Sequence, residues 1–211
     1  MGRTQKIVTT GLWAIVVLAM IALVASRSVA RRDAQPSPSE TSAAKFEPLF
    51  PSPAFHLTDQ NGKPFKQSDL LGNVWIADFV FTHCGGPCPI MTSKLADVQK
   101  QVPRPDVKLV SFSVDPERDT PSVLKEYAKQ FGADESRWTF LTGDKQKIYD
   151  TAAAMKITAV PATKDAPIIH SELFLLVNHS GDVVGVYHSN DELEIKRLIA
   201  DASDLAEHSK Q

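Results

Sequence analysis

Apolar residues form two nearly continuous runs in this chain, at residues 73–81 and 107–114. Such β-prone runs are typical of strands that are buried on both faces of a sheet. Between them, residues 90–102 carry apolar side chains at helical spacing. A strand, a helix and a second strand in this order predict a βαβ unit whose two strands run parallel.

Turn and capping residues predict the remaining elements. Pro121 in a first turn and Gly132 at the end mark a helix, with Asp119 or Thr120 as its N-cap. We also expect a hairpin at 55–65, a strand at 138–143, a helix at 144–155, a hairpin at 172–188 and an amphipathic helix at 191–209. This order predicts an α/β fold, with a mixed sheet covered by helices on both faces and an N-terminal β-hairpin extension.

The N-terminal 32 residues differ from the rest. Residues 7–25 carry no charge, and a run of this length can cross a bilayer as a helix. The basic residues Arg3 and Lys6 and the small residues at 28–30 also fit a cleaved signal peptide. The length of the run favours an anchor. Both alternatives place the remaining chain outside the cytoplasm, on the periplasmic-type side.

A linker and one domain are expected to follow. Residues 33–52 are rich in proline, serine and alanine, which is typical of a flexible linker. Residues 53–211 form the predicted domain. Without the five basic residues of the first 32, the chain has 18 basic and 25 acidic residues, which argues against nucleic acid as a partner.

Cys84 and Cys88 are the only cysteines, so the chain is not a disulfide scaffold. They fall where a predicted strand gives way to a helix, and reactive groups favour this place in α/β sheets. Gly85 and Gly86 are expected to permit a sharp turn, with Pro87 in the first helical turn. Because a helix N-terminus stabilises a thiolate, we expect one or both cysteines to have a depressed pKa.

The Cys-x-x-x-Cys spacing puts both sulfurs on one helical face, one turn apart. Two such thiolates can hold Cu(I), and a nearby imidazole allows Cu(II) to bind as well. A purely structural disulfide and a redox-active dithiol remain as alternatives. His170, just before the strand of the 172–188 hairpin, is the candidate third ligand. His83 adjoins Cys84, but neighbours on a strand point to opposite faces, so we expect its ring to face away.

Four segments together resemble the Sco/SenC family of copper chaperones: residues 80–92, 109–132, 138–143 and 170–187. This resemblance implies a thioredoxin-like fold behind one transmembrane helix. It also implies that Cys84, Cys88 and His170 bind copper, as Cu(I) or Cu(II). Asp115 and Asp119 match acidic positions that the family places near its site, although Asp119 also fits a simple helix cap.

The resemblance further implies a partner and a role. The chain is expected to deliver copper to the dinuclear copper site of cytochrome c oxidase, in a subunit II-like partner, or to reduce that site's cysteines. Other copper chaperones or thiol reductants are further expected partners. This role is not that of an enzyme in the turnover sense. The alternative is a thiol–disulfide oxidoreductase with Cys84 and Cys88 as catalytic residues. Gly85 departs from the proline that family members commonly have after the first cysteine.

Overall fold

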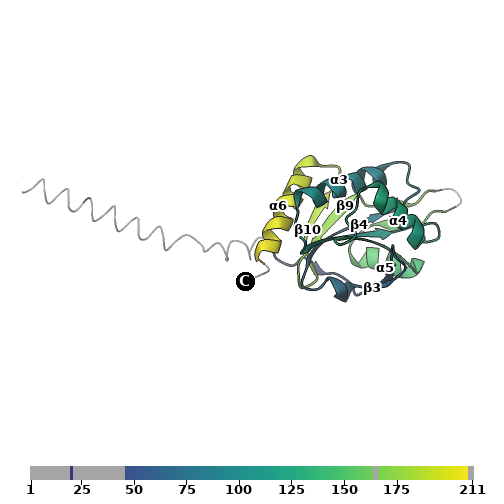
Figure 1. The fold of residues 1–211 in the computed structure, drawn as a ribbon, viewed down its shortest axis with the longest axis horizontal. Coiled ribbons are helices and arrows are strands. Elements are labelled where there is room, and N and C mark those ends of the chain that lie inside the picture. The colour runs from purple at the N-terminus through teal and green to yellow at the C-terminus, as the bar shows by residue number, and fades with distance from the viewer. Residues whose placement is uncertain (1–19, 21–45, 164–165, 209–211) are drawn as a thin grey trace, which may run out of the picture. The chain divides into compact units, whose positions relative to one another are not determined.

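The computed structural model describes residues 46–163 and 166–208, together with Met20 (Figure 1). The described residues from Phe46 onward form one compact unit. In the part of the chain that is described, no helix is long and apolar enough to cross a membrane. Apart from Met20, the anchor predicted at residues 7–25 lies outside the described residues, and so does most of the predicted linker.

A mixed eight-stranded sheet, in the order β1-β10-β9-β4-β5-β6-β2-β3, forms the centre of this unit. Its strands are β1 (Phe50–Pro51), β2 (His56–Asp59), β3 (Pro64–Lys66), β4 (Val74–Val80), β5 (Val107–Ser113), β6 (Trp138–Thr142), β9 (Leu173–Val177) and β10 (Asp182–His188). Strands β4, β5 and β6 pair in parallel, and β9 joins β4 antiparallel. The predicted mixed sheet with a parallel centre is therefore confirmed.

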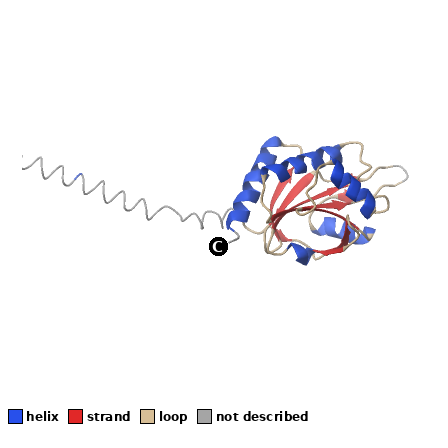
Figure 2. Cartoon of the chain, in the orientation of Figure 1, coloured by secondary structure: helices blue, strands red, loops and turns tan. Residues whose placement is uncertain are grey.

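Helices cover both faces of the sheet (Figure 2). They are η1 (Gln67–Leu70), α3 (Pro87–Gln101), α4 (Pro121–Gln130), α5 (Lys145–Ala154) and α6 (Glu192–His208). The helices α3, α4 and α6 share one core cluster with the sheet, whereas α5 belongs to the cluster on the opposite face. All seven residues of β4 are buried, as its continuous apolar run predicts.

Two short features extend the predicted pattern. Strand β1 pairs with β10 through Phe50 and Pro51, so the sheet begins earlier in the chain than residue 53. Strands β7 (Ala159–Val160) and β8 (Ile169–His170) form a separate small antiparallel pair in a stretch for which no element was predicted. Two-residue strands leave almost no periodicity in a sequence, which is why neither feature was predicted.

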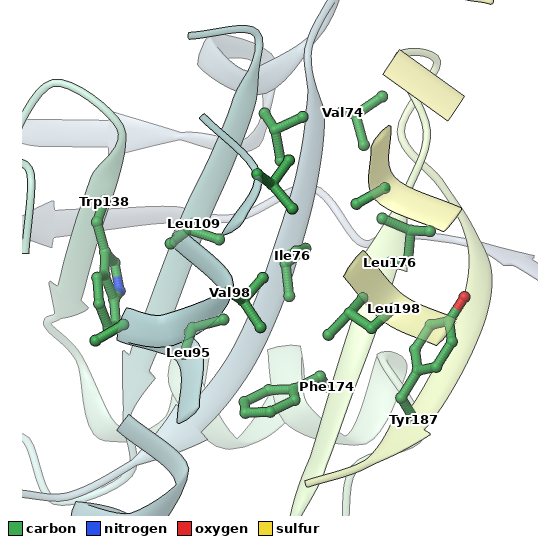
Figure 3. Packing of buried hydrophobic residues seen from close by; sticks show 14 of the residues in the cluster. Val74, Ile76, Leu95, Val98, Leu109, Trp138, Phe174, Leu176, Tyr187 and Leu198 are labelled. Atoms are coloured by element: carbon green, nitrogen blue, oxygen red, sulfur yellow. The ribbon is translucent and has the colours of Figure 1, made fainter. Parts of the chain in front are cut away.

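The core on the α3 and α6 face offers a matched stability test. Leu198 of α6 is 0% exposed and packs in this core, whereas Leu193 in the same helix is 66% exposed (Figure 3). Leu198→Ala is expected to lower the free energy of unfolding by about 2–5 kcal/mol through lost burial and the remaining cavity. Leu193→Ala makes the same chemical change and should stay within about 0.5 kcal/mol of the parent. Urea unfolding measures both, and equal effects would contradict this packing.

Candidate metal and thiol site

The two cysteines lie where β4 passes into α3, as predicted from the sequence. After β4 a turn carries Cys84, and α3 begins at Pro87 with Gly86 as its N-cap. The Cys84 amide donates to the Phe81 carbonyl at 3.3 Å, which closes the turn. Both thiols are free; Cys84 is half-buried and Cys88 is completely buried.

Gly85 and Gly86 lie in this turn, and Gly86 has φ −137° and ψ −109°. A Cβ built on either residue would meet nothing within 4 Å, and neither residue has a positive φ. The expectation that glycine permits this sharp turn stays a prediction. Proline at the first helical position, Pro87, is confirmed.

The β7–β8 pair brings His170 to the cysteines across about eighty residues of sequence. Its Nε2 lies 2.9 Å from the Cys88 sulfur. Strand β9, which follows His170, pairs with β4, so the segment that carries His170 enters the sheet beside the cysteine-bearing strand. The ring also contacts Phe81 edge-on, at 5.7 Å between centroids.

Hydrogen bonding fixes the tautomer of His170. Its Nδ1 lies 3.1 Å from the Ser171 carbonyl, which can only accept, so Nδ1 carries the proton. Nε2 then presents a lone pair toward Cys88. Burial lowers the pKa of His170, which favours the neutral ring. A neutral imidazole held this way is the form in which histidine binds a metal.

The pKa of the Cys88 thiol differs from the predicted value in its direction of shift. Burial raises the pKa of the Cys88 thiol, and its hydrogen bond with Cys84 raises the pKa further. The predicted depression of the pKa is therefore wrong for Cys88. The reason is geometric, because the Cys88 amide at the start of α3 donates to the Cys84 sulfur at 3.5 Å. The Cys88 sulfur itself lies in the interior, where an anion is poorly solvated.

Cys88 lies next to both Cys84 and His170, but the three side chains do not form a closed metal site. Cys88 contacts His170 through its sulfur, whereas Cys84 contacts Cys88 through the backbone amide. Among the described residues, no group of three or more histidine, cysteine or acidic side chains is arranged to hold a metal ion. Cys84 is the more exposed of the two cysteines.

The reason for which the His83 ring was expected to face away from the sulfurs does not apply. It is exposed and occupies a turn, not a strand, so strand alternation does not set its direction. Its Nδ1 lies 3.2 Å from the Thr82 hydroxyl.

The acidic residues of the 115–119 segment have distinct environments. Thr120 caps α4 by accepting from the Val123 amide, so the cap interpretation of Asp119 is wrong. The Asp119 carboxylate instead faces the turn that carries Cys84, where it accepts from Thr82. Asp115 is largely buried and lies 3.6 Å from Arg118. Burial raises the pKa of Asp115, and the Arg118 charge opposes this effect.

Asp78 is the residue that sequence reasoning missed. It lies in the middle of β4, fully buried, and neither carboxylate oxygen finds a hydrogen-bond partner within the described residues. Burial raises its pKa to about 7, and Ser111 at the paired position of β5 offsets only part of this effect. A negative charge on Asp78 also raises the pKa of Cys88. The signal was available, because Asp78 is the single charged residue in the apolar run 73–81.

Comparison with known proteins gives a consistent result. The family model described as SCO1/SenC matches residues 45–207. A curated relative, the SCO1 protein homolog of Bacillus subtilis (strain 168), is 36% identical over 152 residues, covering 70% of this chain and 78% of the relative.

Solved structures agree with the sequence match. The structure of BsSco, described as having a disulfide switch and as a member of the Sco family of cytochrome c oxidase assembly proteins, gives a TM-score of 0.68 at 34% identity. The match covers 76% of this chain and 96% of BsSco. Arabidopsis thaliana ScoI with copper bound gives a TM-score of 0.63 at 29% identity, covering 71% and 96% of the two chains.

Proposed function

Because the chain belongs to the SCO1/SenC family, we propose that it is a copper-binding chaperone that holds its cargo with Cys84, Cys88 and His170. The observation that carries this proposal is the 2.9 Å approach of His170 Nε2 to the Cys88 sulfur. This short distance places the imidazole lone pair of His170 beside one sulfur of a free dithiol. Soft sulfur ligands select Cu(I), and the imidazole adds a ligand that suits Cu(II). The copper-bound Arabidopsis relative supports copper as the cargo.

The geometry suggests how copper enters and leaves. Cys88 is the buried part of the site, whereas Cys84 and His170 are both half-buried. Copper binding displaces the thiol protons, because thiolates are the metal ligands. A partner's sulfur can then approach from the Cys84 side and replace these ligands one at a time. Transfer by ligand exchange needs no free copper ion at any stage.

The recipient and the location are further parts of the proposal. We expect the copper to reach a subunit II-like partner of cytochrome c oxidase, and the description of BsSco as an oxidase assembly protein supports this recipient. Copper chaperones or thiol reductants are the expected donors of metal and electrons. The uncharged run at residues 7–25 supports anchoring with the domain outside the cytoplasm.

His170→Ala is expected to weaken Cu(II) binding by more than about 100-fold, since changes outside the ligand shell alone cost 10–100-fold. Cu(I) binding should fall far less, because the two thiolates remain. Titration of the reduced protein, with competing chelators for each oxidation state, measures both affinities. His56→Ala is the matched control, because His56 is exposed on β2, beyond β5 and β6 from the cysteine-bearing strand. Absence of copper binding by the fully reduced parent would refute the proposal.

A second function, thiol–disulfide exchange, is favoured by the unequal exposure of the two free cysteines. The Cys84 thiolate would attack a partner's disulfide, forming a mixed disulfide and releasing one partner thiolate. The Cys88 thiol would then lose its proton and attack the Cys84 sulfur. This second step closes the Cys84–Cys88 disulfide, releases the partner's other thiol and completes a two-electron reduction. Reductase activity that His170→Ala leaves unchanged, without any copper binding, would favour this function over the first.

A further inference from the structure

Asp119 is a buried acid whose carboxylate makes no helix cap. It is 0% exposed, and Thr120 supplies the cap of α4. Its Oδ2 accepts from the Thr82 amide at 3.1 Å and from the Ser113 hydroxyl at 2.6 Å. Its Oδ1 accepts from the Thr82 hydroxyl at 2.5 Å. All three of these groups are donors, which is the arrangement that a buried carboxylate requires.

These bonds connect two parts of the fold that the sheet alone does not hold together. Ser113 is the last residue of β5, and Thr82 lies in the turn after β4, two residues before Cys84. The sheet contributes a last backbone bond there, from the Val114 amide to the Val80 carbonyl. Beyond this point, Asp119 ties the cysteine-bearing turn to the end of β5.

The hydroxyl of Thr82 also restrains the next residue, His83. Because its hydroxyl donates to Asp119, the same oxygen can accept from His83 Nδ1, which lies 3.2 Å away. Bonds to an ionised acceptor are stronger than bonds between neutral groups. The position of Thr82 is therefore set more firmly than exposed turn residues usually are.

We propose that Asp119 is a positioning residue for the cysteine site: through Thr82 it sets the place of Cys84 relative to Cys88 and His170. As far as copper is concerned, this inference rests on the proposed function. Its effect on the two thiols does not, because the bonds are made in the free-thiol form of the chain.

Thr82→Val tests the inference, because it keeps the side-chain shape and the amide bond but removes the hydroxyl. In the metal-free protein, the equilibrium with oxidised glutathione converts the dithiol to the Cys84–Cys88 disulfide and yields two reduced glutathione molecules. Losing a bond made in the dithiol form should shift this equilibrium toward the disulfide by about three- to tenfold. Cu(II) affinity should fall by about 10-fold, as for other groups that orient ligands.

Three further variants separate positioning from general stability. Thr82→Ser keeps the hydroxyl and should restore both parent values. Asp119→Asn offers one acceptor oxygen in place of two and should reproduce the Thr82→Val effects. Thr151→Val removes a comparably buried hydroxyl, which donates to the Lys147 carbonyl within α5 on the other face of the sheet. It should shift neither the thiol equilibrium nor the copper affinity.

The positioning role of Asp119 can fail without the proposed copper binding failing, and the reverse is also true. A Thr82→Val protein that matches Thr151→Val in the glutathione equilibrium would overturn the positioning role. Failure of Thr82→Ser to restore the parent equilibrium would overturn it as well. If the parent binds no copper, the proposed function fails, but the glutathione equilibrium still tests Asp119.

Discussion

The Cu(I) affinity of Cys88→Ser is expected to fall by more than about 100-fold, the largest loss we expect from a single substitution in this chain. A hydroxyl does not replace a thiolate as a ligand for Cu(I), which prefers soft sulfur. Changes outside the ligand shell cost 10–100-fold, so losing a ligand should cost more. Competition with a chromophoric Cu(I) chelator, on protein kept reduced, measures this affinity.

Met91→Leu is the matched control for Cys88→Ser. Met91 also carries sulfur, lies in α3 and is buried, but it packs in the hydrophobic core. Leucine and methionine have similar volumes, so the fold should tolerate the exchange at a cost below about 1.5 kcal/mol. Its Cu(I) affinity should equal that of the parent. Parent-like affinity in Cys88→Ser would show that Cys88 does not bind copper.

Asp78→Asn is expected to stabilise the protein, by an amount that grows as the pH rises. Burial raises the Asp78 pKa from 3.8 to about 7, so between these values the folded protein keeps a proton that the unfolded chain has released. Stability therefore falls as the pH rises through this range. The pKa difference corresponds to about 4 kcal/mol, which is fully expressed above pH 7. Asparagine does not titrate and escapes this cost.

Urea unfolding of reduced protein at pH 4 and pH 8 measures this effect. The advantage of Asp78→Asn over the parent should be about 4 kcal/mol larger at pH 8 than at pH 4. Asp97→Asn is the control, because that side chain is 59% exposed in α3 and should change stability by about 0.5 kcal/mol or less at either pH. A pH-independent difference for Asp78→Asn would mean that the carboxyl keeps its ordinary titration in the folded protein.

Most of the fold was predictable because its elements carry long, regular patterns. The continuous run at β4 and the helical spacing in α3 and α6 each extend over enough residues to identify the element. Both hairpins follow from Asn-Gly and Ser-Gly turn signals and are confirmed. The two-residue strands β1, β7 and β8 were not predictable, because their pairing partners lie far away in sequence or across a loop.

The position of the two cysteines in the fold was predictable, whereas the titration of their thiols was not. The sequence places Cys84 and Cys88 at the junction of a strand and a helix, and the structure confirms that junction. It does not indicate which sulfur the helix amide faces, and the pKa of Cys88 is raised where a depressed pKa was expected. Desolvation depends on atoms from several elements that pack over the sulfur, and no local sequence pattern determines their positions.

The sequence by itself determined the order of elements, the cysteine spacing and the motifs that the family shares, because these depend on residues close together in the chain. Only the tertiary structure decided that His170 meets Cys88 and that Asp119 binds the cysteine turn instead of capping α4. It also decided that Asp78 is buried, with neither carboxylate oxygen in a hydrogen bond within the described residues. These three facts depend on which segments the sheet brings side by side. The pairing of β9 with β4, and of β4 with β5, therefore turns separate residues into one site.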